Sequence, residues 1–148
     1  EKHSSIPELV LENLYKDELV LVGAPDHPLA NNASVNWEQV LNYQFVFREQ
    51  GSNTREIFEE WIIRYGLSKP KGIELASTEA IKRMIASGTA LGVISMLAAE
   101  WEIKAGYLTR IPLSGFVLER TFRLAYHKDK RPTPLLTEFK QFLKRSLQ

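Results

Sequence analysis

The chain has 148 residues, of which 25% are charged and 44% are hydrophobic, and its formal net charge is +1. This length allows one domain or two small lobes with a buried core. The near-neutral charge does not support a direct nucleic-acid interface, because DNA-binding domains usually carry a clustered basic face. The chain has no cysteine, which excludes disulfides and thiolate chemistry and fits a cytoplasmic protein. No apolar run approaches the roughly 20 residues of a membrane span, so no membrane partner is expected.

The sequence predicts strands that alternate with helices. Two apolar runs, 9–11 and 18–23, are predicted as strands, and a rigid turn with two prolines follows them. The remaining predicted elements are a helix at 37–42 capped by Asn36, a strand at 44–47, a helix at 54–65, a strand at 72–76, a helix at 78–87, a strand at 91–95, a helix at 96–104, strands at 107–113 and 117–126, and a helix from Pro134. This alternation implies right-handed crossovers, a largely parallel sheet and an α/β fold class.

The segment 45–56 carries the strongest functional signal. An apolar strand passes through a glycine turn into hydroxyl and amide side chains that suit a helix start. A helix N-terminus presents unpaired backbone N–H groups at the positive end of the helix dipole, an arrangement that binds small anions. Arginine is unfavourable in a first helical turn unless something negative lies nearby. The segment therefore predicts an anion site, and its candidate ligand-binding residues are Gly51, Ser52, Asn53, Thr54 and Arg55, with Arg48 and Arg55 flanking the loop.

Two further loops, 76–79 and 94–96, have the same pattern and add Thr78 and Ser95 to the candidate ligand-binding residues. Each loop follows an apolar strand, carries a hydroxyl and opens a helix. Ligands of open α/β sheets bind where loops leave the carboxyl ends of strands, so the three loops together favour a carboxylate, sulfate or phosphate. The alternative for each hydroxyl is a simple helix cap, and the alternative for Arg55 is a solvated helix residue.

Catalytic motifs are not found in the sequence. It contains no nucleophile elbow, phosphate-binding P-loop, dinucleotide fingerprint or paired metal-ligand spacing. We therefore predict no catalytic residue, no metal ligand and no cofactor.

Three segments resemble one known family. Residues 17–29, Asp-Glu-Leu-Val-Leu-Val-Gly-Ala-Pro-Asp-His-Pro-Leu, resemble the crossover into the second lobe of LysR-type transcriptional regulators. Residues 48–55 resemble the effector-binding loop of that family, in the branch that includes the Calvin-cycle and cysteine/sulfur-assimilation regulators. Residues 77–95 are similar to its segment that begins with serine and Glu-Ala-Ile. The resemblance covers nearly the whole chain.

The resemblance implies a two-lobed effector domain with the type 2 periplasmic-binding-protein fold and an incomplete first lobe. Residues 1–24 would be a remnant of lobe one and the crossover, 25–115 lobe two, and 116–148 the return strand and C-terminal helix of lobe one. The family's N-terminal winged helix-turn-helix, linker helix and first half of lobe one are expected to be missing, and the opening residues 1–7 suggest a strand exit or linker in a longer protein. Strands 18–23 and 120–126 are then expected to have exposed edges or faces.

The function that the resemblance implies is regulatory. A small anionic effector would bind between the lobes and change the geometry of a homodimer or tetramer, and promoter DNA would be bound through the absent N-terminal domain in the cytoplasm. Two alternatives share the fold. One is the solute-binding protein of a transporter, and the other is a two-lobed enzyme acting on an aromatic or amino-acid precursor.

Overall fold

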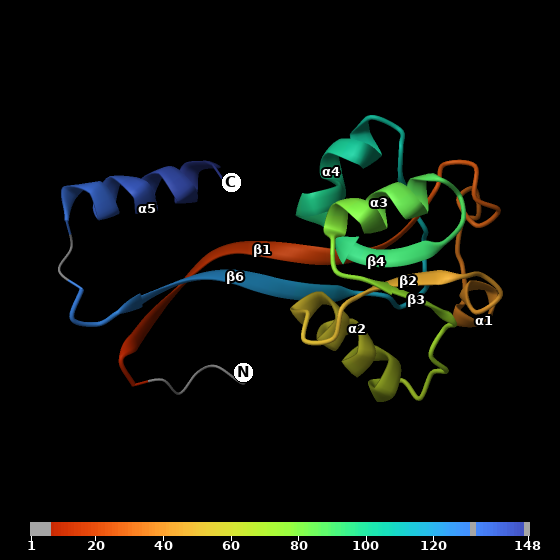
Figure 1. The fold of residues 1–148 in the computed structure, drawn as a ribbon, viewed down its shortest axis with the longest axis horizontal. Coiled ribbons are helices and arrows are strands. Elements are labelled where there is room, and N and C mark those ends of the chain that lie inside the picture. The colour runs from red at the N-terminus through yellow and green to blue at the C-terminus, as the bar shows by residue number, and fades with distance from the viewer. Residues whose placement is uncertain (1–6, 131–132, 147–148) are drawn as a thin grey trace. The chain divides into compact units, whose positions relative to one another are not determined.

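The computed structural model describes residues 7–130 and 133–146, so the prediction of a strand exit or linker at residues 1–7 lies outside the described residues except for Pro7. The chain divides into two compact units, one made of residues 1–17 and 120–148 and the other of residues 18–119. Both boundaries fall within long strands, β1 (Leu9–Gly23) and β6 (Leu118–His127) (Figure 1).

A mixed sheet forms the centre of the larger unit. Its strand order is β3-β2-β4-β1-β5, and β6 pairs with β1. The short strands are β2 (Phe45–Arg48), β3 (Gly72–Leu75), β4 (Leu91–Ser95) and β5 (Thr109–Arg110). Strand β2 pairs in parallel with both β3 and β4, whereas β1 is antiparallel to β4 and β5. The predicted α/β class is confirmed, and the parallel pairing holds for the strands that helices connect.

Helices cover both faces of this sheet (Figure 1). On one face lie α1 (Trp37–Val40) and α2 (Asn53–Arg64), and on the other lie α3 (Thr78–Ala86) and α4 (Met96–Lys104). Successive strand residues point to opposite faces, so they feed separate cores. Phe45 and Phe47 belong to the core with α2, where the Phe45 and Phe58 rings stack with centroids 5.3 Å apart, whereas Val46 belongs to the core with α3.

The structure corrects the prediction for the first two strands. Runs 9–11 and 18–23 form one continuous strand, because the polar residues between them have partners: the buried carboxylate of Asp17 accepts a hydrogen bond from Arg120 Nε at 2.7 Å. The expectation of exposed faces is wrong for 18–23, where Leu19 to Gly23 are buried in the larger unit. It is confirmed for 120–126, whose residues are all half-buried or exposed.

The predicted strand at 107–113 is shorter in the structure. Only Thr109 and Arg110 pair with β1, opposite Gly23 and Val22. Pro112 has no N–H to donate, which fits an end of the ladder at this point.

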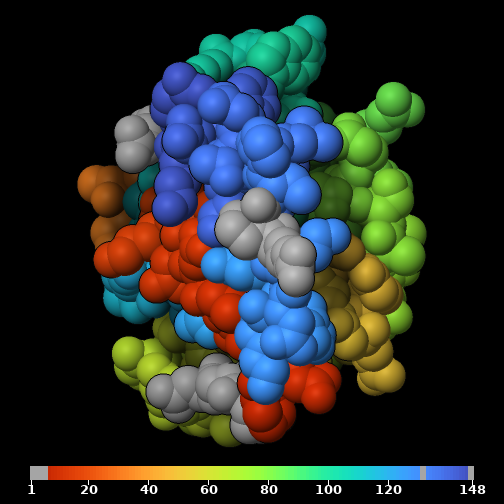
Figure 2. All heavy atoms as spheres, turned by 90° about the vertical axis from the view of Figure 1, so that its left-hand side faces the viewer, coloured from red at the N-terminus to blue at the C-terminus, as the bar shows by residue number. Residues whose placement is uncertain are grey.

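The smaller unit contains the start of β1, most of β6 and helix α5 (Pro134–Ser146). Glu12 links all three, because its carboxylate accepts hydrogen bonds from Tyr126 Oη at 2.5 Å and from Lys140 Nζ. Figure 2 draws the atoms of α5 in blue and those of the start of β1 in red. None of the described residues of α5 is buried, and Leu135 is 80% exposed, so its apolar stripe has no cover in this unit.

We predict that Phe58→Ala strongly destabilises the larger unit. Phe58 is 2% exposed and packs against five aromatic side chains, Trp37, Phe45, Phe47, Trp61 and Phe116, so truncation removes burial and leaves a cavity. The expected loss of unfolding free energy is about 3–5 kcal/mol. Urea denaturation measures it, with Ile63→Ala as the control. Ile63 lies on the same helix but is 77% exposed, so a loss of the same size there would contradict the assignment of the core.

Candidate functional site

Three strand ends meet at one edge of the sheet. Arg48, the last residue of β2, pairs with Leu75 at the end of β3, and β4 runs parallel to β2 on its other side. Because the carboxyl ends of parallel strands lie on the same side of a sheet, the loops into α2, α3 and α4 open at this edge. The structure therefore brings together the three loops that the sequence singled out.

Two of the hydroxyls at this edge cap helices. Ser77 Oγ accepts a hydrogen bond from the backbone N–H of Ala80 at 3.3 Å, and Ser95 Oγ accepts one from Ala98 at 3.4 Å. Ser52 occupies the same cap position before α2, but its side chain makes no capping bond. Ser95 therefore caps its helix, and its role in holding a ligand stays a prediction, whereas the Ser52 hydroxyl makes no capping bond.

The loop before α2 depends on Gly51. Its φ of +83° lies in the left-handed region, which favours glycine because side chains with a Cβ are strained there. Asn53 begins the helix and is exposed, whereas Thr54 is 7% exposed and faces the core. Asn53 therefore lies on the open side of the loop and Thr54 on the inner side.

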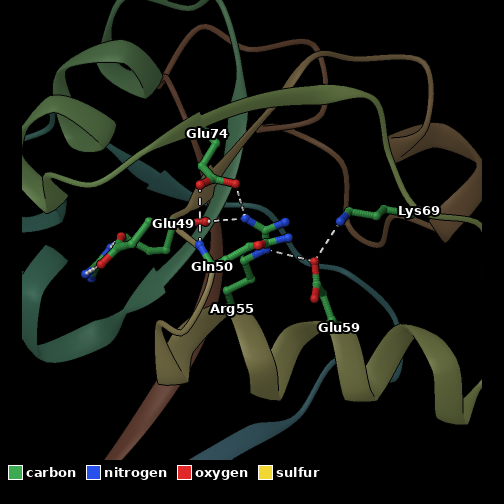
Figure 3. Close-up of polar contacts among 7 residues, drawn as sticks. Glu49, Gln50, Arg55, Glu59, Lys69 and Glu74 are labelled. Atoms are coloured by element: carbon green, nitrogen blue, oxygen red, sulfur yellow. Dashed lines mark hydrogen bonds and ion pairs between the residues drawn. The ribbon is translucent and has the colours of Figure 1, made fainter.

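The Arg55 guanidinium connects the start of α2 to the neighbouring strands on the inner side of the loop. Its Nε donates to Glu59 at 2.9 Å, and its Nη1 donates to the backbone oxygen of Arg48 at 3.0 Å and to Glu74. Figure 3 shows the Arg55 side chain between these two carboxylates. The side chain is only 10% exposed, and the hydrogen bonds to Glu59 and then Glu74 raise its pKa. Arg55 thus fastens α2 to β2 and β3, and a direct role in holding a ligand stays a prediction.

Arg48 makes a different set of contacts. Its Nε and Nη2 each donate to one carboxylate oxygen of Glu49, both at 2.8 Å, and its Nη1 donates to Thr78 Oγ1 at 3.1 Å. The hydrogen bonds from Arg48 lower the pKa of Glu49 to about 2, so that this carboxylate is charged at neutral pH. The hydrogen bond from Arg48 to Thr78 connects the start of α3 to the end of β2.

Carboxylates offset the positive charge around the loop. Besides its bond with Arg55, Glu59 accepts from Lys69 at 2.6 Å, and this bond is the main reason that its pKa is lowered. Glu74 also accepts from the backbone N–H of Gln50 at 3.4 Å. The cluster that we call the loop charge cluster therefore contains three cations and three carboxylates, namely Arg48, Arg55, Lys69, Glu49, Glu59 and Glu74.

The sequence analysis missed these carboxylates as partners of the arginines. One signal was present, because Arg55 and Glu59 have the i,i+4 spacing of a helical ion pair. The contact of Arg55 with Glu74 had no such signal, since 19 residues separate the two in the chain. Glu49 follows Arg48 directly in the chain, but this adjacency alone does not predict a bidentate contact between their side chains.

The cavities limit where a ligand fits. Behind the loop lies a cavity of about 10 Å³, room for about one water molecule. A larger hollow of about 350 Å³ lies elsewhere in the same unit, and its lining includes Glu60, Arg64 and Val117 but none of the candidate residues. A metabolite is too large for the cavity behind the loop, and the larger hollow lies away from the candidate residues. Among residues 7–130 and 133–146, no cluster of histidine or acidic side chains is arranged to hold a metal ion.

A sheet covered on both faces, with helix N-termini and arginines gathered at its carboxyl edge, defines an α/β ligand-binding domain. Comparison with known families identifies which one. Residues 2–148 match the family described as LysR substrate binding domain, and the chain belongs to this family. It is a family of transcriptional regulators, and the type 2 periplasmic-binding-protein-like fold expected from the sequence is confirmed.

Individual relatives agree with this assignment. The RuBisCO operon transcriptional regulator of Allochromatium vinosum is 31% identical over 136 residues, which are 92% of this chain and 45% of that protein. The regulatory domain of Synechocystis PCC6803 CcmR, solved in complex with 2-PG, is 26% identical with a TM-score of 0.83, and the match covers 97% of this chain and 69% of that one. The effector-binding domain of QuiR in complex with shikimate is 20% identical, covers 97% and 68%, and shares the fold at a TM-score of 0.76.

The chain spans about half the length of the curated relatives that it matches. Within the part of the chain that the structure describes, no helix is both long and apolar enough to cross a membrane.

Ser77 and Ser52 both stand at N-cap positions, but only Ser77 makes a capping bond, so they give a matched prediction. Ser77→Ala should lower the unfolding free energy by about 1 kcal/mol, because it removes a capping hydrogen bond. Ser52→Ala should cost about 0.5 kcal/mol or less, because no capping bond is lost. Chemical denaturation of the two variants side by side measures the difference, and equal losses would show that the Ser52 hydroxyl also caps its helix.

The Arg48–Glu49 contact predicts a pH effect. The Glu49 carboxyl should titrate near pH 2 instead of near its ordinary value of 4.5, so the stabilising effect of the pair is present above about pH 4.5 and is lost as the pH falls toward 2. In Arg48→Gln the pKa of Glu49 should return toward 4.5. Carbon-detected NMR titration of the carboxyl groups measures both. Glu12, whose pKa is also about 2 because of Lys140 and Tyr126, is the internal control and should not change.

Proposed function

We propose that this chain is the effector-binding part of a LysR-type transcriptional regulator and that it senses a small anionic metabolite. The observation that carries the proposal is the sheet edge where three helices begin beside Arg48 and Thr78. Family membership supports the regulatory role, and the complex of the related CcmR domain with 2-PG supports a small-molecule effector.

The chemistry of the edge supports an anion. Helix N-termini supply partial positive charge and unpaired N–H groups, and a guanidinium supplies paired donors for two oxygens. The candidate ligand-binding residues remain those of the sequence analysis, with Gly51, Ser52 and Asn53 on the open loop and Thr78 beside Arg48. Thr54 and Arg55 support this loop from the inner side, and Ser95 opens the neighbouring helix.

The wider regulator is inferred from the family. Lobe two would comprise residues 25–115, which lie within the compact unit of residues 18–119, and residues 1–24 and 116–148 would belong to lobe one. Effector binding would change the geometry of a homodimer or tetramer, and a DNA-binding domain elsewhere in the protein would read the promoter in the cytoplasm. A coupling free energy of about 1–3 kcal/mol is enough to change the affinity for DNA about 5- to 150-fold.

The two alternatives from the sequence analysis are not favoured. A match to the LysR family over residues 2–148 supports a regulator over a transporter's solute-binding protein. It also supports a protein without catalytic activity, because the homologues are transcriptional regulators.

A ligand screen by thermal melting tests this function. The chain would be melted with sulfate, phosphate, 2-PG and shikimate. An anion present at 100 times its dissociation constant should add about 2.7 kcal/mol of stability, which for a protein of this size raises Tm by roughly 5–10 °C.

The variant Thr78→Val should reduce that shift, because the hydroxyl beside Arg48 is lost. Thr89→Val, which changes a threonine beyond the other end of α3, is the control and should keep the shift. If no anion of the panel stabilises the chain, the proposed anionic effector is wrong.

A further inference from the structure

The two arginines of the loop charge cluster differ in what their contacts hold together. Arg55 joins α2, β2 and β3 through side chains and a backbone oxygen, and it is 10% exposed. Two of the three polar contacts of the Arg48 side chain are with Glu49, the next residue in the chain, and the side chain is 25% exposed. A contact between neighbours closes no loop and ties no elements together. Arg48 is therefore the arginine that is available to exchange its partner.

The Arg48–Glu49 pair has the geometry of a bound ligand. Two parallel N–H···O bonds of 2.8 Å join the guanidinium to both oxygens of one carboxylate. The same fork binds an external carboxylate, sulfate or phosphate, because these groups present two oxygens at similar spacing. The third contact, from Nη1 to Thr78 at 3.1 Å, holds the guanidinium at the start of α3. The Glu49 carboxylate thus lies where an oxyanion ligand of Arg48 would lie.

We propose that Arg48, held by Thr78, is the anion-binding group of the candidate site, and that the Glu49 carboxylate occupies it until the effector displaces it. This inference rests on the proposed function and adds the residue that holds the anion and the group that competes with it. Exchange of one oxyanion for another keeps the guanidinium paired in both states. The competition lowers the apparent affinity by the fraction of time for which Arg48 is unoccupied.

Exposure supports the exchange. The Glu49 side chain is 35% exposed, so it is able to turn into solvent when an effector takes its place. Solvation of the released carboxylate lowers the cost of displacement, since a charge that moves to water regains its hydration. Glu59 and Glu74 cannot both turn into solvent in this way, because both bind Arg55, which joins α2 to β2 and β3.

The test measures sulfate and inorganic phosphate binding to the purified chain by isothermal titration calorimetry at constant ionic strength. The key variant is Glu49→Gln, which keeps the size of the side chain and removes the competing charge. If Glu49 occupies Arg48 for about 90% of the time, this variant should bind the anion about tenfold more tightly. Arg48→Gln should lose anion binding, and Arg48→Lys should recover only part of it, because lysine lacks the paired donors.

A charge control separates displacement from a general change in electrostatics. Glu56→Gln removes the same charge from the first turn of α2, where the side chain is exposed, and should change the dissociation constant less than about twofold. A tenfold gain in Glu49→Gln without a gain in Glu56→Gln supports the inference. Equal gains in both variants would overturn it.

The remaining outcomes distinguish this inference from the proposed function. If the wild type binds the anion and Glu49→Gln binds no more tightly, the displacement is wrong and the anion sensor stands. If Arg48→Gln folds, as shown by its circular dichroism, and binds with unchanged affinity, Arg48 is not the binding group. If neither the wild type nor Glu49→Gln binds either anion, both the inference and the anionic effector are overturned.

Discussion

The parallel pairing of β2 with β3 on one side and β4 on the other is the constraint on which the rest of the larger unit depends. It sets the two cores, because a shift of one residue would turn Phe45 and Phe47 away from α2. It also sets the edge at which three helices begin. The approach of β3 requires Gly72, since a Cβ at that position would lie 1.9 Å from the backbone oxygen of Phe45.

The electrostatics of the edge follow from that pairing. Parallel register brings Glu74 of β3 within reach of Arg55 and of the loop backbone. The three cations and three carboxylates of the loop charge cluster therefore balance, so the cluster is neutral overall. This neutrality is the basis of the proposed exchange, in which an anion replaces a carboxylate and does not fill an unpaired positive site. The distinction between Arg55, which holds elements together, and Arg48, which holds only its neighbour and Thr78, comes from this arrangement.

Much of the fold was predictable from local pattern. The helices α2, α3 and α4 were placed to within one residue, because apolar periodicity, a polar residue at the start and glycine at the end agree for each. Strand β1 was not predictable as one element. Its middle residues are polar, and what keeps them extended is pairing with β6, where Arg120 meets Asp17 and Tyr126 meets Glu12 across more than 100 residues of chain.

The sequence by itself determined the α/β class, the LysR resemblance, and the loops whose residues suit an anion site. These features depend on residue type and short-range spacing, which the chain carries wherever it folds. Only the tertiary structure decided which charges meet. Arg48 and Arg55 look equivalent in the sequence. In the structure Arg55 joins two strands and a helix, whereas Arg48 binds the Glu49 carboxylate that we propose is displaced. Contacts of this kind depend on the register of strands far apart in the chain, and local pattern carries no information about that register.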